Sequence, residues 1–323
     1  MNASSEYSLI KSRTPLTMET IGILLVAFGA AFWGLGGVLR TPLGTHLTSA
    51  QVVFVEHLLL CLYAIPVVWI GRRQLQTLNF KQWGAILFIS WGASGAANIF
   101  FTAAFQYGHP SVVLLLQKLQ PIIVLITARI LLKEKLPRTF GIELLIALAG
   151  TYLLTFGFTT PFHDVTPEKV IGSLLSIGAA VLWGGGTVAG RYLLGKVSFE
   201  TLAGSRFLFA LPFMAMLVAS EGSSWSHMFE RAFTTSDILF FLIILVTGIV
   251  SMLLYYRGLS RTKASYATLA ELSFPAIGVI VNWVFLDQLL SIGQWIGFII
   301  IWFVVFRITR RSEAPDDNIL KAA

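Results

Sequence analysis

Charged residues are scarce in this chain of 323 residues, and their scarcity excludes a water-soluble domain. Asp, Glu, Lys and Arg make up 12% of the sequence, whereas hydrophobic residues make up 56%. A soluble domain carries about 25% charged residues, because polar groups have to coat its surface. The composition therefore predicts a polytopic membrane protein whose surroundings are the lipid bilayer.

Cysteine is almost absent, and so are the motifs of several protein classes. The single cysteine, Cys61, excludes an internal disulfide and any metal site with several cysteine ligands. There is no Walker motif for ATP, and no pattern predicts a metal or a cofactor. The net charge of +7 would indicate nucleic acid in a soluble protein, but basic cytoplasmic loops explain it in a membrane protein. We therefore expect no nucleic-acid partner.

Ten apolar segments are long enough to be spanning helices, since a helix needs roughly 20 mostly apolar residues to cross a bilayer. They are residues 21–40, 50–70, 83–105, 111–131, 140–158, 170–190, 199–219, 237–258, 264–286 and 291–308. The segments between them are short and polar, so no soluble domain fits between spans. The sequence predicts an all-α polytopic membrane protein with ten transmembrane helices.

Lysine and arginine orient these spans in the membrane. If the N-terminus is cytoplasmic, 17 of the 23 basic residues fall on inner segments and 3 on outer ones, namely Arg40, Lys169 and Arg231. Cytoplasmic loops carry such an excess of basic residues. We predict that both termini are cytoplasmic and that the protein resides in the cytoplasmic membrane of a bacterium. Ten is an even number of spans, which puts both termini on the same side of the membrane, as this orientation requires.

The two halves of the chain resemble each other. "AAFWGLGGVL" (30–39) matches "AAVLWGGGTVAG" (179–190), and "LLLQKLQPIIVLITARILLKEKL" (114–136) matches "TLAELSFPAIGVIVNWVFLDQLL" (268–290). Segments 114–136 and 268–290 each have a proline in the middle of the helix and an acidic residue near its end. The acidic residue is Glu134 in the first segment and Asp287 in the second. Five spans per half is an odd number, so the second half is inverted. Inverted repeats are typical of secondary transporters, with the substrate site near the midplane.

The predicted domains follow from this repeat. They are a cytoplasmic tail (1–20), a first five-helix repeat (21–158), a second, inverted repeat (170–308) and a cytoplasmic tail (309–323). The first tail lacks the apolar core of a signal peptide, so the first span is expected to be retained.

At these positions the chain resembles the drug/metabolite transporter (DMT) superfamily, in particular its EamA-type members. The resemblance rests on Trp33-Gly34, Trp183-Gly184, "SRFLFALP" (205–212), the two prolines and the two helix-end acids. It implies a ten-helix exporter or exchanger of small metabolites such as amino acids, with a cavity lined by helices one, three, four, six, eight and nine. One departure is Glu56-His57, which stands where the second half has Arg206-Phe207.

Five charged or titratable residues lie inside the predicted spans: Glu56, His57, Lys118, Arg206 and Glu271. A charge at mid-membrane costs about 2.5–3.5 kcal/mol on insertion scales, so each needs a reason. A helix rises about 1.5 Å per residue, which puts Glu56, His57 and Lys118 roughly 10 Å below the outer surface of the membrane. The same rise puts Arg206 and Glu271 roughly 10 Å above the inner surface. We predict two ion pairs, Glu56–Lys118 and Arg206–Glu271. They either gate the substrate pathway or hold helices together permanently.

Histidine and several polar or aromatic residues extend the predicted site. His57 either packs through a hydrogen bond or couples transport to protons, because histidine titrates near neutral pH. Trp33, Asn98, Gln117 and Trp183 lie inside spans that the resemblance assigns to the cavity, and Tyr255 lies near the inner end of the eighth span.

The sequence therefore predicts a secondary transporter of a small polar metabolite, such as an amino acid or related zwitterion, that works by alternating access. A phosphorylated or nucleotide-linked substrate is the alternative, although it would favour more cationic groups than Lys118 and Arg206. An intramembrane serine hydrolase is a remote alternative, because Gly92-Ala93-Ser94-Gly95 matches a GxSG string. The base that Ser94 would need, His57, lies upstream of it, opposite to the rhomboid order. We expect no enzyme activity.

Overall fold

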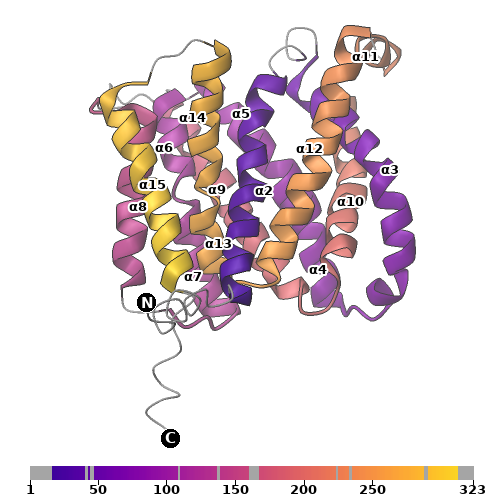
Figure 1. Ribbon diagram of the computed structural model, residues 1–323. Coiled ribbons are helices and arrows are strands. Elements are labelled where there is room, and N and C mark those ends of the chain that lie inside the picture. Colours follow the sequence, from indigo (N-terminus) through magenta and orange to yellow (C-terminus); the bar gives the residue numbers. More distant parts are fainter. Residues whose placement is uncertain are drawn as a thin grey trace, which may run out of the picture.

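The protein is a bundle of helices throughout the part of the chain that the structure describes (Figure 1). The structure is a computed structural model, and it describes residues 17–40, 43, 47–107, 110–136, 139–159, 167–222, 225–232, 235–286 and 290–311.

Each half of the chain contributes a similar series of helices. The first half contains α2 (Met18–Arg40), α3 (Ser49–Gln76), α4 (Phe80–Leu87), η2 (Phe88–Ala96), α5 (Ala97–Tyr107), α6 (Pro110–Gln117), α7 (Gln120–Leu131) and α8 (Phe140–Phe156). The second half contains α9 (Pro167–Leu193), α10 (Phe199–Ser220), α11 (Trp225–Ala232), α12 (Thr235–Leu259), α13 (Ala264–Ala270), α14 (Ser273–Leu286) and α15 (Ile292–Arg311).

Within the described residues, these segments make ten passages through the bundle, which confirms the predicted number. The third passage is α4, η2 and α5 in sequence, the fourth is α6 with α7, and the ninth is α13 with α14. The short helix α11 lies between the seventh and eighth passages. Helix α15 runs to Arg311, so the last helix includes the first residues of the tail predicted to start at 309.

Two passages predicted as single helices are interrupted. The fourth turns at Lys118 and the ninth turns at Glu271. Pro121 then lies in the first turn of α7, and Pro275 in the first turn of α14. Proline has no N–H and its ring clashes with the preceding turn, so a helix stops before it but begins well with it in the first turn. The two midpoint prolines of the repeat thus produce two breaks, each beside a charged residue.

The third passage is also irregular, because its middle nine residues form the π-helical segment η2. The wider turn appears in the hydrogen bond from Ala97 N to Gly92 O, five residues back. A Cβ atom on Gly95 would strike the ring of Phe213 on α10, so glycine permits close packing there. Such π-helical turns occur frequently at functional sites.

The acid at the end of the fourth passage caps the ninth. Glu134 accepts hydrogen bonds from Ala264 N at 2.8 Å, from Ser265 N at 3.2 Å and from Ser265 Oγ at 2.6 Å. It thereby satisfies backbone donors in the first turn of α13 that have no partner within the helix. The matching acid of the second half, Asp287, lies outside the described residues.

The packing of the helices repeats between the halves. Helix α2 packs against α12 and α14, and its counterpart α9 packs against α5 and α7. Helices α3 and α10 pack against each other, as do α8 and α15 (Figure 1). Exchanging the two halves leaves this set of neighbours unchanged, which is the pattern of a twofold-related inverted repeat.

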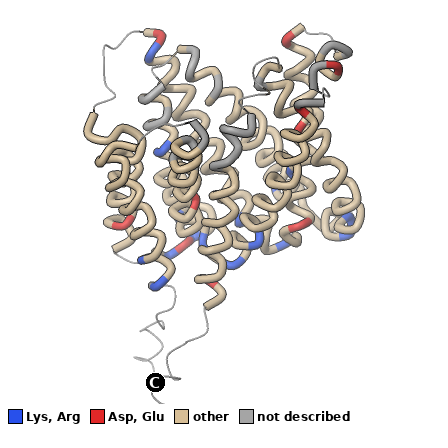
Figure 2. Tube along the Cα trace, turned by 45° about the horizontal axis from the view of Figure 1, so that its top comes forward, with Lys and Arg blue, Asp and Glu red and all other residues tan. Residues whose placement is uncertain are grey.

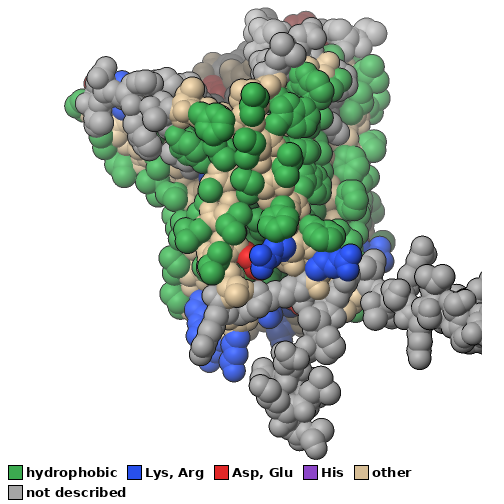
Figure 3. Space-filling model, turned by 60° about the vertical axis from the view of Figure 1, so that its left-hand side comes forward, with side chains coloured by type: hydrophobic (Ala, Val, Ile, Leu, Met, Phe, Trp, Pro, Cys, Tyr) green, Lys and Arg blue, Asp and Glu red, His purple; other side chains and the backbone are tan. Residues whose placement is uncertain are grey.

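The outer surface of the bundle is suited to lipid. Leu62, Ile65, Trp69 and Ile70 on α3 are all more than half exposed. Within the described ranges, six helices are both long and apolar enough to cross a membrane. Figure 3 shows apolar side chains covering the middle of one face, with Lys and Arg at its lower edge. Figure 2 shows basic residues at the end of the bundle where α2 begins and α15 ends, which we call the basic end. The chain is an integral membrane protein.

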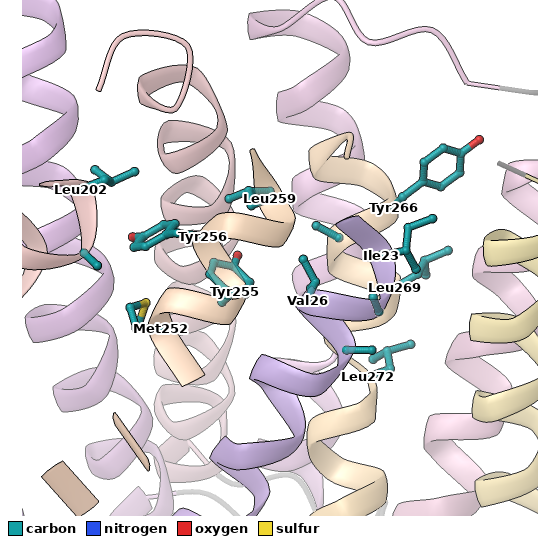
Figure 4. Packing of buried hydrophobic residues seen from close by; sticks show 14 of the residues in the cluster. Ile23, Val26, Leu202, Met252, Tyr255, Tyr256, Leu259, Tyr266, Leu269 and Leu272 are labelled. Atoms are coloured by element: carbon teal, nitrogen blue, oxygen red, sulfur yellow. The ribbon is translucent and has the colours of Figure 1, made fainter. Parts of the chain in front are cut away.

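A layer of buried apolar side chains packs between α2, α10, α12 and α13 (Figure 4). Ile23 of α2, Leu202 of α10, and Tyr256 and Leu259 of α12 are at most 1% exposed. Leu269 of α13 joins them from the ninth passage. Ile23 and Leu202 lie within two turns of the start of their helices and Leu259 ends α12, so the layer lies towards the basic end.

Candidate functional site

A cavity of about 1140 Å³ lies in the middle of the bundle. Its described lining residues come from every passage except α8 and α15. The resemblance implied six lining helices, and the structure adds α3 and α10 to them. Thr48 and Glu221, which line its mouth at the end opposite the basic end, are hydrogen-bonded to each other at 2.8 Å. The described lining therefore extends from Thr48 and Glu221 to Tyr255, which is next to Tyr256 of the apolar layer.

All ten predicted site residues line this one cavity. They are Trp33, Glu56, His57, Asn98, Gln117, Lys118, Trp183, Arg206, Tyr255 and Glu271. All ten are polar or aromatic residues inside apolar spans, and polar groups face the bundle interior because lipid cannot solvate them.

Glu271 accepts hydrogen bonds from three side chains. Its carboxylate accepts from Tyr255 Oη at 2.8 Å, from Gln120 Nε2 at 2.9 Å and from Thr187 Oγ1 at 3.4 Å. Thr187 Oγ1 also lies 3.0 Å from Tyr255 Oη. These partners stand on α12, α7 and α9, so Glu271, at the break of the ninth passage, connects four passages.

The two helix breaks are linked directly. Gln120 is the first residue of α7, and its bond to Glu271 joins the break of the fourth passage to that of the ninth. Gln117 extends the chain, with its Nε2 3.5 Å from Gln120 Oε1. Breaks in two symmetry-related helices that meet at the bundle centre are the arrangement in which transporters bind substrate.

Lys118 lies in the turn between α6 and α7 and is only 9% exposed. Its Nζ lies 5.4 Å from the centroid of the Phe274 ring, a cation–π contact. The position directly after α6 also suits a cation, because the last carbonyl groups of a helix carry partial negative charge.

The two predicted ion pairs are not formed among the described residues. Lys118 faces Phe274 and makes no ion pair with Glu56. Arg206 donates from Nη1 to Tyr256 Oη at 3.2 Å, and Glu271 is held by uncharged donors. Arg206 still acts on Glu271 electrostatically. The sequence placed these charges in one cavity, but partners depend on which helix faces meet, and pattern alone does not fix that.

Glu56 and His57 are both buried on α3 and both line the cavity. His57 Nδ1 lies 2.9 Å from Val53 O, one turn earlier in the same helix. Since a carbonyl only accepts, Nδ1 carries the proton of this bond. The His57 ring meets Phe207 edge to face at 6.2 Å. This geometry suits the packing role, and proton coupling stays a prediction.

Aromatic pairs form much of the cavity wall. Trp33 packs against Tyr255 with ring centroids 5.1 Å apart. Trp183 packs edge to face against Phe101 at 5.2 Å. Asn98 donates to Ser94 O at 2.6 Å. The cavity therefore combines aromatic walls with amide and charged groups.

Two residues of the central network, Gln120 and Thr187, were missed by sequence reasoning. Gln120 directly precedes Pro121, so a polar residue beside a midpoint proline was the available signal. Thr187 lies one turn after Trp183 on α9 and therefore shares its face.

Ser94 does not have the surroundings of a nucleophile. Its Oγ donates to Ile89 O at 3.2 Å, within the π-helical segment. His57, the base that it would need, bonds to the backbone of its own helix instead.

Comparison with known proteins agrees with the repeat and the cavity. Residues 20–156 and 170–310 each match the EamA-like transporter family. The chain is 33% identical to the riboflavin transporter ImpX of Fusobacterium nucleatum over 90% of this chain and 97% of that protein. It is 25% identical to a riboflavin transporter of Brucella anthropi, over 78% of this chain and 85% of that protein.

A solved crystal structure shares the fold. It has a TM-score of 0.71 and 19% identity, and the match covers 90% of this chain and 99% of the solved one. With two family matches across most of its length and a relative of one-third identity, the chain belongs to the EamA-like transporter family of the DMT superfamily and is a membrane transporter, not an enzyme.

Proposed function

We propose that this protein carries riboflavin across the membrane by alternating access. The observation that carries the proposal is the 33% identity, over 90% of this chain, to a protein named as a riboflavin transporter. The second relative with that name matches over 78% of the chain. Each match is longer than one repeat, so neither likeness is confined to a single half of the chain.

The chemistry of the cavity supports riboflavin as the substrate. Riboflavin consists of a flat aromatic isoalloxazine ring, with carbonyl and N–H groups on one edge, and a hydroxyl-rich ribityl chain. Aromatic side chains such as Trp33 and Trp183 offer faces and edges to such a ring. Asn98, Gln117 and Gln120 supply amide groups for its polar parts. The volume of about 1140 Å³ slightly exceeds the upper end of the range for small-molecule pockets, about 1,000 Å³, so a ligand of the size of riboflavin fits.

A zwitterionic amino acid is the second candidate, favoured by the balance of charges in the cavity. Lys118 and Arg206 are matched there by Glu56 and Glu271. The same balance disfavours a phosphorylated or nucleotide-linked substrate, because a phosphate would meet two carboxylates as well as two cations.

We place the protein in the cytoplasmic membrane of a bacterium with both termini inside. The excess of basic residues on the inner segments supports this orientation. The cavity would then face outward, and the apolar layer that includes Tyr256 and Leu259 would separate it from the cytoplasm. The second state of the cycle opens that layer and closes the mouth at Thr48 and Glu221.

Uptake into proteoliposomes tests the proposal. Liposomes with the purified protein should take up radiolabelled riboflavin saturably, with competition by excess unlabelled riboflavin but not by a panel of amino acids. Protein-free liposomes are the control. Uptake of an amino acid without uptake of riboflavin would replace this proposal by the second candidate. Repeating the assay with and without a pH gradient tests proton coupling through His57.

A further inference from the structure

Lys118 is a buried cation whose donors have no oxygen acceptor in the described structure. Its ammonium carries three N–H donors, and its recorded contact is the face of the Phe274 ring. The side chain is 9% exposed and lines the cavity. The ammonium nitrogen is not sealed off from the cavity, so a ligand there can accept from its donors.

The neighbouring polar groups of the two breaks are already engaged. Glu271 holds three donors, and Gln120 donates to it. Arg206 donates to Tyr256 Oη. Lys118 differs from these groups because the N–H donors of its ammonium face the cavity and donate to no described oxygen there.

The position of Lys118 is also fixed. It lies in the turn between two half-helices, and Pro121 sets the start of the second. Gln117, one residue earlier, begins the amide chain that leads to Glu271. A cation beside an amide and an aromatic face is suited to a flat ligand with acceptor oxygens along one edge.

We infer that Lys118 is a substrate-specificity residue that donates to carbonyl oxygens on the edge of the flavin ring, while Phe274 contacts the ring itself. This inference rests on the proposal that riboflavin is the substrate. It goes further by naming the part of riboflavin that Lys118 recognises. Phosphate or carboxylate oxygens offer a similar acceptor chemistry, so the test has to separate these sources.

Ligand binding to the purified protein in detergent tests the inference. The probes are riboflavin, lumichrome, which keeps the carbonyl edge but lacks the ribityl chain, and flavin mononucleotide, which adds a phosphate. Binding is followed by the change in flavin fluorescence. Lys118→Met should weaken riboflavin and lumichrome alike, by about 10- to 100-fold, which is typical for loss of a hydrogen bond to a charged group. Lys118→Arg should restore part of the affinity, because it keeps a cationic donor.

The control is Lys81→Met, which removes an exposed lysine on α4 away from the cavity and should bind as the wild type does. Size-exclusion profiles identify misfolded variants, and Lys118→Gln, which keeps a neutral donor, replaces Lys118→Met if that variant aggregates. Its affinity for riboflavin and lumichrome should fall below that of the wild type.

Several results would overturn the inference. If the wild type binds riboflavin and Lys118→Met binds it equally well, the role of Lys118 is refuted and the proposed function stands. If Lys118→Met lowers the affinity for riboflavin but not for lumichrome, Lys118 binds the ribityl chain. If flavin mononucleotide loses more affinity than riboflavin, it serves a phosphate. A wild type that binds none of the three refutes the proposed function, and the inference with it.

Discussion

Glu271 accepts hydrogen bonds from side chains on three other passages of the bundle. Removing its charge leaves Tyr255 Oη, Gln120 Nε2 and Thr187 Oγ1 competing for one remaining carbonyl oxygen. A buried donor that loses its acceptor costs about 1–3 kcal/mol. The residue is therefore expected to matter for stability as well as for transport.

A double-mutant cycle measures this contact. Glu271→Gln and Tyr255→Phe should each lower the free energy of unfolding by about 1–3 kcal/mol. The double variant should lose less than the sum, with a coupling energy of about 0.5–3 kcal/mol, because both changes remove one bond. Unfolding in mixed micelles of increasing denaturing detergent gives the free energies.

The control cycle pairs Glu271→Gln with Tyr192→Phe. Tyr192 is 39% exposed on α9, so the two changes should add within about 0.5 kcal/mol. Additivity in both cycles would contradict the hydrogen bond between Glu271 and Tyr255.

At the scale of helices, close contacts at glycine hold the pairs of the inverted repeat together. On α15, a Cβ atom at Gly297 would strike Leu154 N and would lie 2.8 Å from Leu153 C on α8. Gly22 and Gly258 bring α2 and α12 together in the same way. Membrane helices use small residues at such contacts because dispersion, rather than water exclusion, drives their association.

Gly297→Ala should therefore destabilise the protein, whereas alanine normally stabilises a helix relative to glycine. The added methyl group meets backbone rather than a flexible side chain, so α8 and α15 have to separate, at a cost of about 1–3 kcal/mol. The thermal unfolding midpoint in detergent measures the effect.

Gly141→Ala on α8 is the matched control, since a Cβ atom there would meet nothing within 4 Å. It should leave stability unchanged or raise it by about 0.5–1 kcal/mol. If both variants behave alike, helix propensity rather than the α8–α15 contact determines their stability.

At the scale of the whole molecule, the distribution of Lys and Arg predicts how the bundle sits in the membrane. Fusion of a fluorescent protein to the C-terminus should give fluorescent cells, whereas alkaline phosphatase at the same position should be inactive. Alkaline phosphatase fused after Gly222, beyond the end of α10, should be active, because that segment is predicted to be outside. The opposite pattern of activities would mean that the bundle is inverted and that the cavity faces the cytoplasm.

The number of passages and their pairing could be predicted from the sequence for definite physical reasons. Hydropathy gives the spans, because about 20 apolar residues are needed to cross a bilayer. The repeated Trp-Gly and proline positions predict inversion, because five spans per half is an odd number. The ten polar and aromatic residues inside spans, including Glu56 and Lys118, line the cavity because lipid excludes them from the outer surface.

Only the tertiary structure decided which of these residues are partners. The sequence suggests Arg206 as the partner of Glu271 by charge, but Gln120, Thr187 and Tyr255 reach the carboxylate instead. Hydropathy does not distinguish a continuous helix from one that turns at Lys118, because the apolar run is unbroken on either side. The sequence by itself thus determined which residues must leave the lipid, since burial depends on residue type. Their contacts were decided by the rotation and packing of whole helices, which depend on many residues together.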